Sequence, residues 1–336
     1  MQPVSFREAL LFWLKLGFIS FGGPAGQIGL MHQALVVERR WISDKRFLHA
    51  LNYCMVLPGP EAQQLATYLG WLMHRTWGGV MAGLLFVLPS LVLLVGLSWA
   101  YVNFGQLPWM TALFNGIKPA VIAIVAQAVW RVGSRTLKHP VHWVLALGSL
   151  LATAFLQLPF PLVLLVAAAV GWVFRGRLSN ANESGHASSG GHNPLPAHAP
   201  FRPSRAAKWV LIGALLWGLP MALLGWWFGP SNTLWQMGAF FSKAALMTFG
   251  GAYAVLPYVF QGAVETYHWL TPAQMMDGLA LGESTPGPLI MVVTFIGFLG
   301  GHVQPVMAGE HGALWSALLG ALVATWVTFL PSFLFI

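Results

Sequence analysis

Two sets of helix-breaking residues occur twice in this chain at one constant offset. Phe21-Gly22-Gly23-Pro24 is followed by Pro58-Gly59-Pro60, and 228 positions later Phe249-Gly250-Gly251-Ala252 is followed by Pro286-Gly287-Pro288. Gly and Pro are common in membrane helices, but chance does not explain this shared spacing. Matched breakers in two apolar halves are typical of transporters built from a duplicated unit. This repeat constrains the fold more than any other feature of the sequence.

Composition places both halves in a membrane. Hydrophobic residues make up 57% of the chain and charged residues 8%, whereas about a quarter of a soluble domain is charged. The apolar runs are continuous, which favours helices over a barrel. The net charge of +8 does not indicate nucleic acid, because nearly all Lys and Arg lie at or before Lys208, mostly in short loops. The single cysteine, Cys54, excludes an internal disulfide and a cysteine metal or redox pair, and we expect neither a metal nor a cofactor.

Each breaker separates two helices that are too short to cross a bilayer. The apolar run before Gly22 has about fifteen residues, so it extends roughly 22–24 Å against a bilayer core of about 30 Å. We interpret each pair as a hairpin that enters the membrane and returns, and one kinked crossing remains the alternative. The predicted fold is an all-α integral membrane protein with re-entrant or broken helices at the FGG and PGP motifs.

The loop charges indicate that the second copy is inverted relative to the first. Residues 38–46 hold four cations, whereas the matched residues 266–274 hold none. By the positive-inside rule the first loop is cytoplasmic, as are the N-terminus and the linker between the copies. The asymmetry is the one expected of an inverted-topology repeat. Full crossings are predicted at 77–103, 109–131, 140–156, 159–174 and 208–228.

The predicted domains are a first transporter repeat at 1–177, a flexible linker at 178–207, a connecting helix at 208–233 and a second repeat at 234–336. The linker is rich in Ser, Gly, Asn and Pro, so a solvated segment is favoured over a metal-sensing tail despite its evenly spaced His186, His192 and His198.

The second copy departs from the first near its end. After an insertion near 300–313 the match resumes, so that Leu88-Pro89-Ser90 corresponds to Leu330-Pro331-Ser332. The chain stops at Ile336 without counterparts of the first copy's last three crossings. The second copy is short or the chain is truncated, and we expect truncation.

The FGG and PGP units, together with Glu38-Arg39-Arg40-Trp41 and Gly116-Ile117-Lys118-Pro119-Ala120, resemble the chromate ion transporter family. The resemblance covers nearly the whole chain. It implies a two-domain, multi-pass protein of the bacterial inner membrane that exports chromate, driven by the proton-motive force. The implied partners are chromate, protons and the lipid bilayer, with sulfate as a second candidate anion and a homodimer left open. The missing C-terminal helices and Ala252 in place of Pro24 depart from the family pattern.

The breaker motifs are the predicted site for the anion. Helix N-termini offer unpaired N–H groups and a positive dipole end, and glycine lets the backbone approach closely. The alternative is that these residues only permit tight helix packing. The predicted anion-binding turns comprise Gly22, Gly23, Pro58, Gly59, Pro60, Gly250, Gly251, Pro286, Gly287 and Pro288.

Lys15, Lys118 and Lys243 are the lysines placed inside apolar segments. Charges at membrane depth are rare and costly, so we predict that these lysines provide counter-charge to the anion. Lys15 and Lys243 also keep the repeat offset. The alternative is that the side chains snorkel to the surface, which is most plausible for Lys15.

Two carboxylates flank the PGP turns, Glu61 just after the first and Glu283 just before the second. A carboxylate at this depth can carry a coupling proton. Alternatively, Glu61 caps its half-helix. Further polar residues that could line a path are Asn52, Gln63, Gln64, Asn115, Ser284 and Thr285, although each alone is more often an interhelical hydrogen bond.

A membrane-embedded enzyme is a remote alternative. A serine protease needs a positioned base beside its nucleophile, and the first histidine after Ser284, His302, lies beyond the following half-helix. A reductase needs a flavin, haem or nucleotide motif, and none is found in the sequence. A carrier of sulfate or another oxyanion is the closer rival to chromate, because both dianions are tetrahedral.

Overall fold

The computed structural model describes residues 4–105, 107–137, 139–156, 158, 160–173, 203–249 and 252–336. Within these ranges every regular element is a helix. The first set is α1 (Phe6–Ile19), α2 (Gly23–His32), the π-helix η1 (Gln33–Glu38), α3 (Asp44–Val56), α4 (Glu61–Phe104), α5 (Pro108–Thr136), α6 (Pro140–Ala154) and α7 (Phe160–Val173). The second set is α9 (Pro203–Phe228), α10 (Thr233–Met247), α11 (Ala252–Phe260), the π-helix η3 (Gln261–Thr266), α12 (Pro272–Ser284), the 3-10 helix η4 (Leu289–Met291), α13 (Val292–Val303) and α14 (Gly312–Phe335).

The chain divides into two compact units, residues 1–116 with 195–336 and residues 117–194. The second unit contains most of α5 together with α6 and α7, which pack against each other. Most of the predicted linker lies outside the described residues, and α9 begins at Pro203, inside the range expected for that linker. All features below that involve the FGG and PGP motifs belong to the first unit.

The helices of the first unit repeat with the offset of the sequence motifs. η1 and η3 have the same length and begin 228 positions apart, as do α3 and α12. Even a rare backbone conformation is repeated, since Arg40 has a φ of 53° and His268 a φ of 54°. The breaks predicted at Pro58-Gly59-Pro60 and Pro286-Gly287-Pro288 occur in the structure, because α3 ends at Val56 and α12 ends at Ser284.

The chain reverses at the first FGG motif, as the contacts of the following loop show. The guanidinium of Arg39 lies 4.7 Å from the ring centre of Trp41 and 5.1 Å from that of Phe12 in α1. The second copy repeats this aromatic contact with a neutral residue, because Tyr267 stacks on Trp269 with ring centres 4.6 Å apart.

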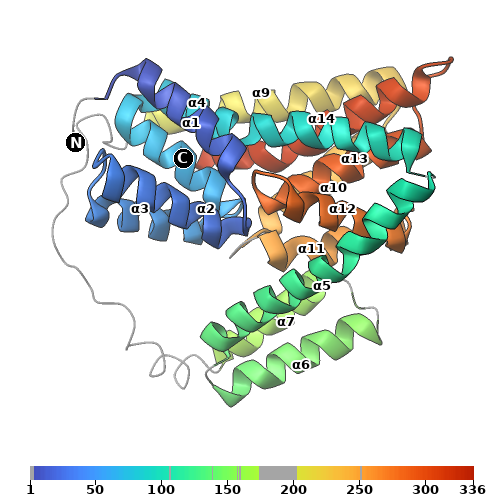
Figure 1. Cartoon of the computed structure of the whole chain (residues 1–336), viewed down its shortest axis with the longest axis horizontal. Helices are drawn as coiled ribbons and strands as arrows, with labels where there is room; N and C mark the ends of the chain where they lie inside the picture. Colours follow the sequence, from blue (N-terminus) through green and yellow to red (C-terminus); the bar gives the residue numbers. More distant parts are fainter. Residues whose placement is uncertain are drawn as a thin grey trace. The chain divides into compact units, whose positions relative to one another are not determined.

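α4 is two helices joined by a tight bend at His74 and Arg75, whose backbone angles are not helical. Its two parts pack closely, since a Cβ atom on Gly70 would lie 2.4 Å from the carbonyl oxygen of Gly78. In the second copy α13 and α14 pack in the same way, side by side (Figure 1), with a Cβ on Gly297 placed 2.3 Å from the oxygen of Gly320. The loop 304–311 joins these helices where the first copy has only the bend, which accounts for the insertion predicted there.

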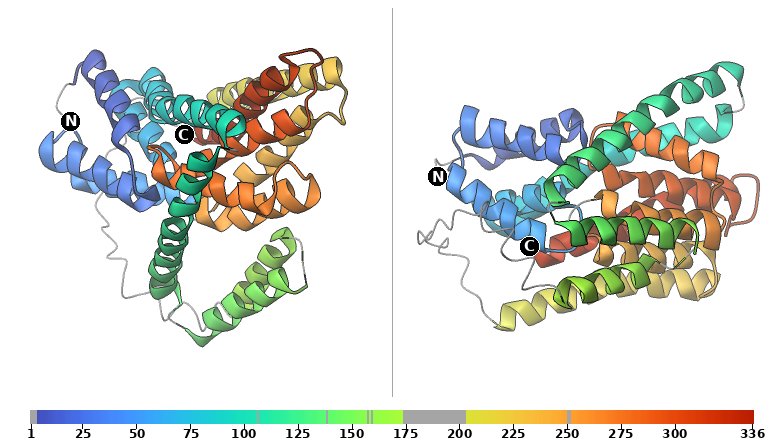
Figure 2. Two further views of the ribbon diagram at one scale, coloured as in Figure 1. Left: turned by 45° about the vertical axis from the view of Figure 1, so that its right-hand side comes forward. Right: turned by 90° about the horizontal axis from the view of Figure 1, so that it is seen from below.

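The hydrophobic core forms two clusters. Trp13, Phe47 and Leu65 belong to the cluster formed by α1, α3 and α4. Trp269 and Phe295 belong to a second cluster, which is built mainly by the second copy and also includes Val87, Leu94 and Phe114 of the first. In both views of Figure 2 the blue helices of the first copy lie together, as do the orange and red helices of the second.

Three of the described helices are long and apolar enough to cross a membrane: Glu61–Phe104, Ala207–Phe228 and Gly312–Phe335. Only 11% of the apolar window in the second of these is buried, so this helix presents apolar side chains outward, as a lipid-facing helix does. α6 and α7, predicted as crossings, are shorter apolar helices of 15 and 14 residues. The architecture is that of an all-helical membrane protein.

Candidate functional site

The two PGP turns are buried, and each depends on its glycine. Gly59 has a φ of 129° and Gly287 a φ of 112°, a region that L-residues rarely adopt. Pro60, Pro286 and Pro288 are buried with them, and Pro58 is half-buried. The sequence therefore uses glycine at both turns for its backbone conformation as well as for its small size.

Each PGP turn is bonded to the helix end of the other copy. Gly59 N–H donates to the carbonyl oxygen of Thr248 at 2.7 Å, and Gly287 N–H donates to the carbonyl oxygen of Ser20 at 2.8 Å. Ser20 and Thr248 are themselves 228 positions apart and immediately precede the FGG motifs. The four breaker motifs are thus joined in two reciprocal pairs.

These bonds change the chemistry expected of the turns. The sequence predicted backbone N–H groups that face an anion, but the N–H groups of Gly59 and Gly287 are already paired with carbonyl oxygens. The N-terminus of α4 differs, since its cap residue Pro60 provides no side-chain hydrogen bond and residues 60–67 are buried. At the first PGP turn, the N-terminus of α4 is therefore the part that suits an anion, because its first N–H groups have no partner within the helix.

Two serines from the long helices contact the same glycines. A Cβ atom on Gly59 would lie 2.7 Å from Ser332 Oγ in α14, and one on Gly287 would lie 2.7 Å from Ser90 Oγ in α4. Each serine again belongs to the copy opposite to the turn it contacts. There is consequently no room for a side chain at either glycine.

Buried glutamine side chains also reach the turns. Gln27 Nε2 donates to the carbonyl oxygen of Gly287 at 2.5 Å and to that of Ser20 at 3.4 Å. Gln64 Nε2 donates to the carbonyl oxygen of Pro58 at 2.8 Å. Gln63 Nε2 donates instead to Thr67 Oγ1, one turn further along α4, at 3.1 Å. Both predicted glutamines, Gln63 and Gln64, are buried, and Gln64 is the one that bonds to the turn.

The glutamines of this polar cluster and Thr67 come from the first copy. At the repeat offset the counterparts of Gln27, Gln63, Gln64 and Thr67 are apolar, namely Val255, Met291, Val292 and Phe295. The backbone arrangement is duplicated, but the polar side chains around it are not. A polar ligand therefore finds more partners on the side of the first copy.

The two predicted carboxylates have different surroundings. Glu61 is 9% exposed and occupies the first turn of α4, the position of the alternative capping role. Glu283 is half-buried and accepts a hydrogen bond from Tyr253 Oη at 2.7 Å. The same Tyr253 oxygen would lie 3.6 Å from a Cβ atom on Gly23. Glu283 is thereby linked to the first FGG motif through a tyrosine of the second copy.

The first FGG motif begins α2. Gly22, with a φ of 87°, is the cap of this helix and is exposed, and Gly23 has a φ of 68°. No side chain caps the helix. Gly250 and Gly251 lie outside the described residues.

The structure does not bring Lys15 and Lys243 into the buried cluster around the turns. Both side chains are exposed, on α1 and α10. Lys15 lines a cavity of about 160 Å³ between α1 and η1, together with Gln33, Glu38 and Arg39. Lys118 is in α5, and its side chain lies outside the described residues.

The remaining predicted path residues lie outside the cluster or bond to their own helix. Asn52, Asn115 and Ser284 are exposed. Ser284 Oγ donates to the carbonyl oxygen of Ala280 at 2.8 Å, and Thr285 Oγ1 donates to that of Leu281 at 2.8 Å.

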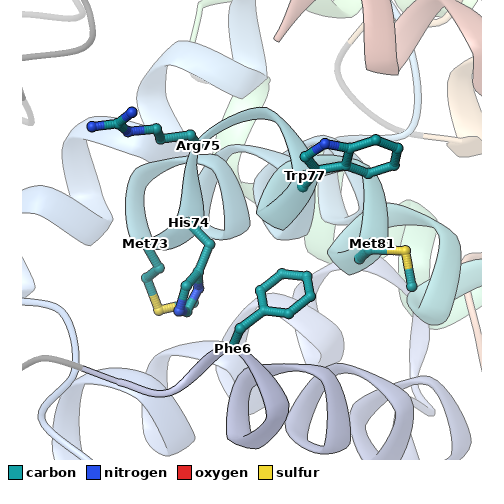
Figure 3. A pocket seen from close by; sticks show the side chains of 6 residues that line it. All are labelled: Phe6, Met73, His74, Arg75, Trp77 and Met81. Carbon is teal, nitrogen blue, oxygen red and sulfur yellow. The ribbon is translucent and has the colours of Figure 1, made fainter.

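A second cavity, of about 500 Å³, lies at the bend of α4 (Figure 3). In that view Phe6 faces His74, and their ring centres are 5.4 Å apart. His74 Nε2 also lies 2.8 Å from the carbonyl oxygen of Val4. Phe6, Met73, Trp77 and Met81 make most of the lining apolar. Arg75 also lines the cavity, but in Figure 3 its guanidinium points away from the other labelled side chains.

Several residues of the cluster were not predicted from the sequence: Ser20, Gln27, Ser90, Tyr253, Thr248 and Ser332. The repeat offset was the signal for some of them. It pairs Ser20 with Thr248, and the Leu-Pro-Ser match pairs Ser90 with Ser332. Gln27 and Tyr253 have no such signal, because their counterparts are Val255 and Ala25.

Long apolar helices, a duplicated unit and buried polar turns together define an integral membrane protein of the transporter class. A family model described as a chromate transporter matches residues 7–172 and 235–336. The chain belongs to the chromate transporter family, which confirms the resemblance noted from the motifs.

The named relatives agree with this assignment. The chain is 33% identical over 330 residues to the chromate transport protein of Cupriavidus metallidurans, covering 98% of this chain and 72% of the relative. It is 35% identical over 334 residues to the chromate transport protein of Pseudomonas aeruginosa, covering 99% of this chain and 72% of the relative. An uncharacterized transporter of Bacillus subtilis, YwrB, is 27% identical over 138 residues, covering 41% of this chain and 70% of the relative. The comparison with solved structures gave no significant match.

Proposed function

We propose that this protein exports chromate across the bacterial inner membrane as a secondary active transporter coupled to the proton-motive force. The observation that carries the proposal is the reciprocal bonding of Gly59 with Thr248 and of Gly287 with Ser20. It joins the broken helices of both copies at one buried polar cluster, the arrangement in which transporters of this kind bind their substrate. The chromate transport proteins of two bacteria supply the candidate substrate.

The membrane potential itself favours export of a dianion. With the cell interior negative, each negative charge that moves outward releases about 2.3 kcal/mol per 100 mV. Because the potential supplies the driving force, the binding site needs only to replace the water around the anion, which neutral hydrogen-bond donors can do. A site with strong fixed positive charge would hinder release of the anion. The start of α4 and the buried amides beside it supply such donors. In this proposal Lys15, Lys118 and Lys243 attract the anion along its route.

Protons are proposed to couple through carboxylates. Glu283 with Tyr253, and Glu61 at the start of α4, lie beside the two kinds of breaker motif. A carboxylate that ionises at the start of α4 would compete with an anion for the same positive helix end. Protonation of Glu61 therefore favours binding of the anion. The proton then leaves with the anion against its own gradient, so the membrane potential, which favours the outward movement of negative charge, is the part of the proton-motive force that drives export.

The proposed topology is inverted, with the repeats at 1–177 and 234–336 oppositely oriented. The charges of two matched positions support this topology. Arg39 packs on Trp41 in the first copy, whereas the matched residue that packs on Trp269 in the second copy is the neutral Tyr267. Cations are retained on the cytoplasmic side of a membrane protein. The hairpins formed at the FGG and PGP motifs would then enter the bilayer from opposite faces.

We expect a cysteine at position 45 to react with a membrane-impermeant maleimide from the cytoplasmic side and one at position 273 from the outside. Lys45 and Ala273 are matched by the repeat and are both exposed, in the first turns of α3 and α12. Labelling of intact and permeabilised cells distinguishes the two sides. The parent chain is the control, because its single Cys54 is buried. Reaction of both positions from one side would disprove the inversion.

Flux into proteoliposomes tests the function directly. Purified protein is reconstituted, and chromate and sulfate uptake are compared with and without an imposed pH gradient and an imposed membrane potential. We expect chromate flux that exceeds protein-free liposomes and increases with the imposed gradient. A preference for sulfate would instead assign the chain as a sulfate carrier, and absence of flux for both anions would refute the proposed function.

A further inference from the structure

Ser90 in α4 and Ser332 in α14 are buried serines that each follow a proline inside a long helix. Their side chains are 1% and 0% exposed. They correspond to each other in the two copies, and each contacts the PGP glycine of the opposite copy. Two symmetry-related hydroxyls therefore lie at the two turns.

These hydroxyls differ from their neighbours in the same helices. Ser98 Oγ in α4 donates to the carbonyl oxygen of Leu94 at 2.6 Å, and Thr328 Oγ1 in α14 donates to that of Ala324 at 2.7 Å. Ser90 Oγ and Ser332 Oγ have no hydrogen-bond partner among the described residues. A buried hydroxyl without a partner costs about 1–3 kcal/mol. A serine inside a helix can avoid this cost by donating to the carbonyl oxygen four residues earlier, as Ser98 does.

The groups around the serines already use most of their donors. Next to Ser332, the Gly59 N–H binds Thr248 and Gln64 Nε2 binds Pro58. Next to Ser90, the Gly287 N–H binds Ser20 and Gln27 Nε2 binds Gly287. Each serine O–H is thus an unused donor at its turn, and beside Ser332 the second N–H of Gln64 Nε2 is a further one.

We propose that Ser90 and Ser332 are substrate-binding residues, which donate one hydrogen bond each to oxygens of a tetrahedral oxyanion during transport. The assignment rests on the proposed function and adds the residues that hold the anion. A tetrahedral dianion offers acceptor oxygens in several directions, so the two hydroxyls can donate to different oxygens, together or in turn as the anion passes. Because the donors are neutral, the anion is held without a fixed counter-charge and can leave again.

The test uses Ser90→Ala and Ser332→Ala with matched controls in the same helices, Ser98→Ala and Thr328→Val. Equilibrium binding of radiolabelled chromate to purified protein gives affinity. The unfolding temperature without anion gives stability. We expect each alanine variant of the proposed pair to bind chromate about tenfold more weakly, the effect of one lost hydrogen bond to a charged group. The unfolding temperature should stay the same or rise, because no protein bond is removed.

The controls are expected to show the reverse, a lower unfolding temperature with unchanged affinity, because each loses a bond within its helix. If an alanine variant fails to insert into the membrane, Ser90→Cys and Ser332→Cys replace it, because cysteine is close to serine in volume but its S–H is a weak hydrogen-bond donor. Their affinity for chromate should still fall. Unchanged chromate affinity in the serine variants, beside a wild type that binds chromate, overturns this assignment alone. A wild type that binds neither chromate nor sulfate overturns the proposed function, and the assignment with it.

Discussion

Gly59→Ala and Gly287→Ala variants are expected to insert into the membrane and to lose at least about nine-tenths of chromate flux, with Gly59→Leu and Gly287→Leu inactive. The added Cβ would lie 2.7 Å from Ser332 Oγ in one variant and 2.5 Å from Ser90 Cβ in the other. Such contacts force the turn away from the opposite copy, and positive φ adds on the order of 1–3 kcal/mol of strain. A loss of 1.4 kcal/mol in a required conformation already lowers its population about tenfold.

Gly309→Ala is the matched control for this experiment. Gly309 has a φ of 98°, but a Cβ atom there would meet nothing within 4 Å. This variant carries the backbone strain without the contact between the copies, so it should transport nearly as well as the parent chain. Flux in proteoliposomes, normalised to inserted protein, decides the matter. If Gly59→Ala and Gly287→Ala behave like Gly309→Ala, the turns do not take part in transport.

Glu283→Gln is expected to abolish the stimulation of chromate flux by an imposed pH gradient while exchange of chromate for chromate continues. The substitution keeps the shape and removes the ionisable group that Tyr253 binds at 2.7 Å. A carboxylate beside the first FGG motif can exchange a proton as that motif moves, whereas an amide cannot. Tyr253→Phe should weaken the stimulation in part, because the carboxylate loses its hydrogen-bond donor but can still ionise.

Glu310→Gln serves as the control, since Glu310 is exposed in the loop between α13 and α14. Its response to the pH gradient should equal that of the parent chain. Glu61→Gln, measured alongside, shows whether the carboxylate at the start of α4 shares the role. A Glu283→Gln protein that keeps the full response to the gradient would remove Glu283 from the coupling scheme.

The repeat was the most productive prediction from sequence. One offset located both PGP turns, the ends of α3 and α12, and the insertion after α13. It succeeded because glycine and proline act on the local backbone, so their spacing alone predicts where a helix stops. The family resemblance followed from the same residues and is confirmed over most of the chain.

The partners of the turns could not be predicted in this way. That Gly59 binds Thr248 depends on how two copies pack, and no local pattern encodes the choice. Intramembrane charge drew attention to Lys15 and Lys243, yet both side chains are exposed in the structure. Gln27 and Ser90 are neutral, so no charge marks them in the sequence. Their role becomes visible only when their burial and hydrogen bonding are known.

The reciprocal bonds of the PGP turns have a consequence for how such a chain can be divided. A polypeptide with one FGG and PGP set has a glycine N–H and a serine or threonine carbonyl that are complementary, but each is placed to bind a second set. Such a half-length protein would be self-matching, and we expect it to be completed by association with another unit. When two units are joined in one chain, each always has the other as its partner, so the two sequences can diverge. In this chain they have done so, because Gln27, Gln63 and Gln64 of the first half correspond to Val255, Met291 and Val292 of the second.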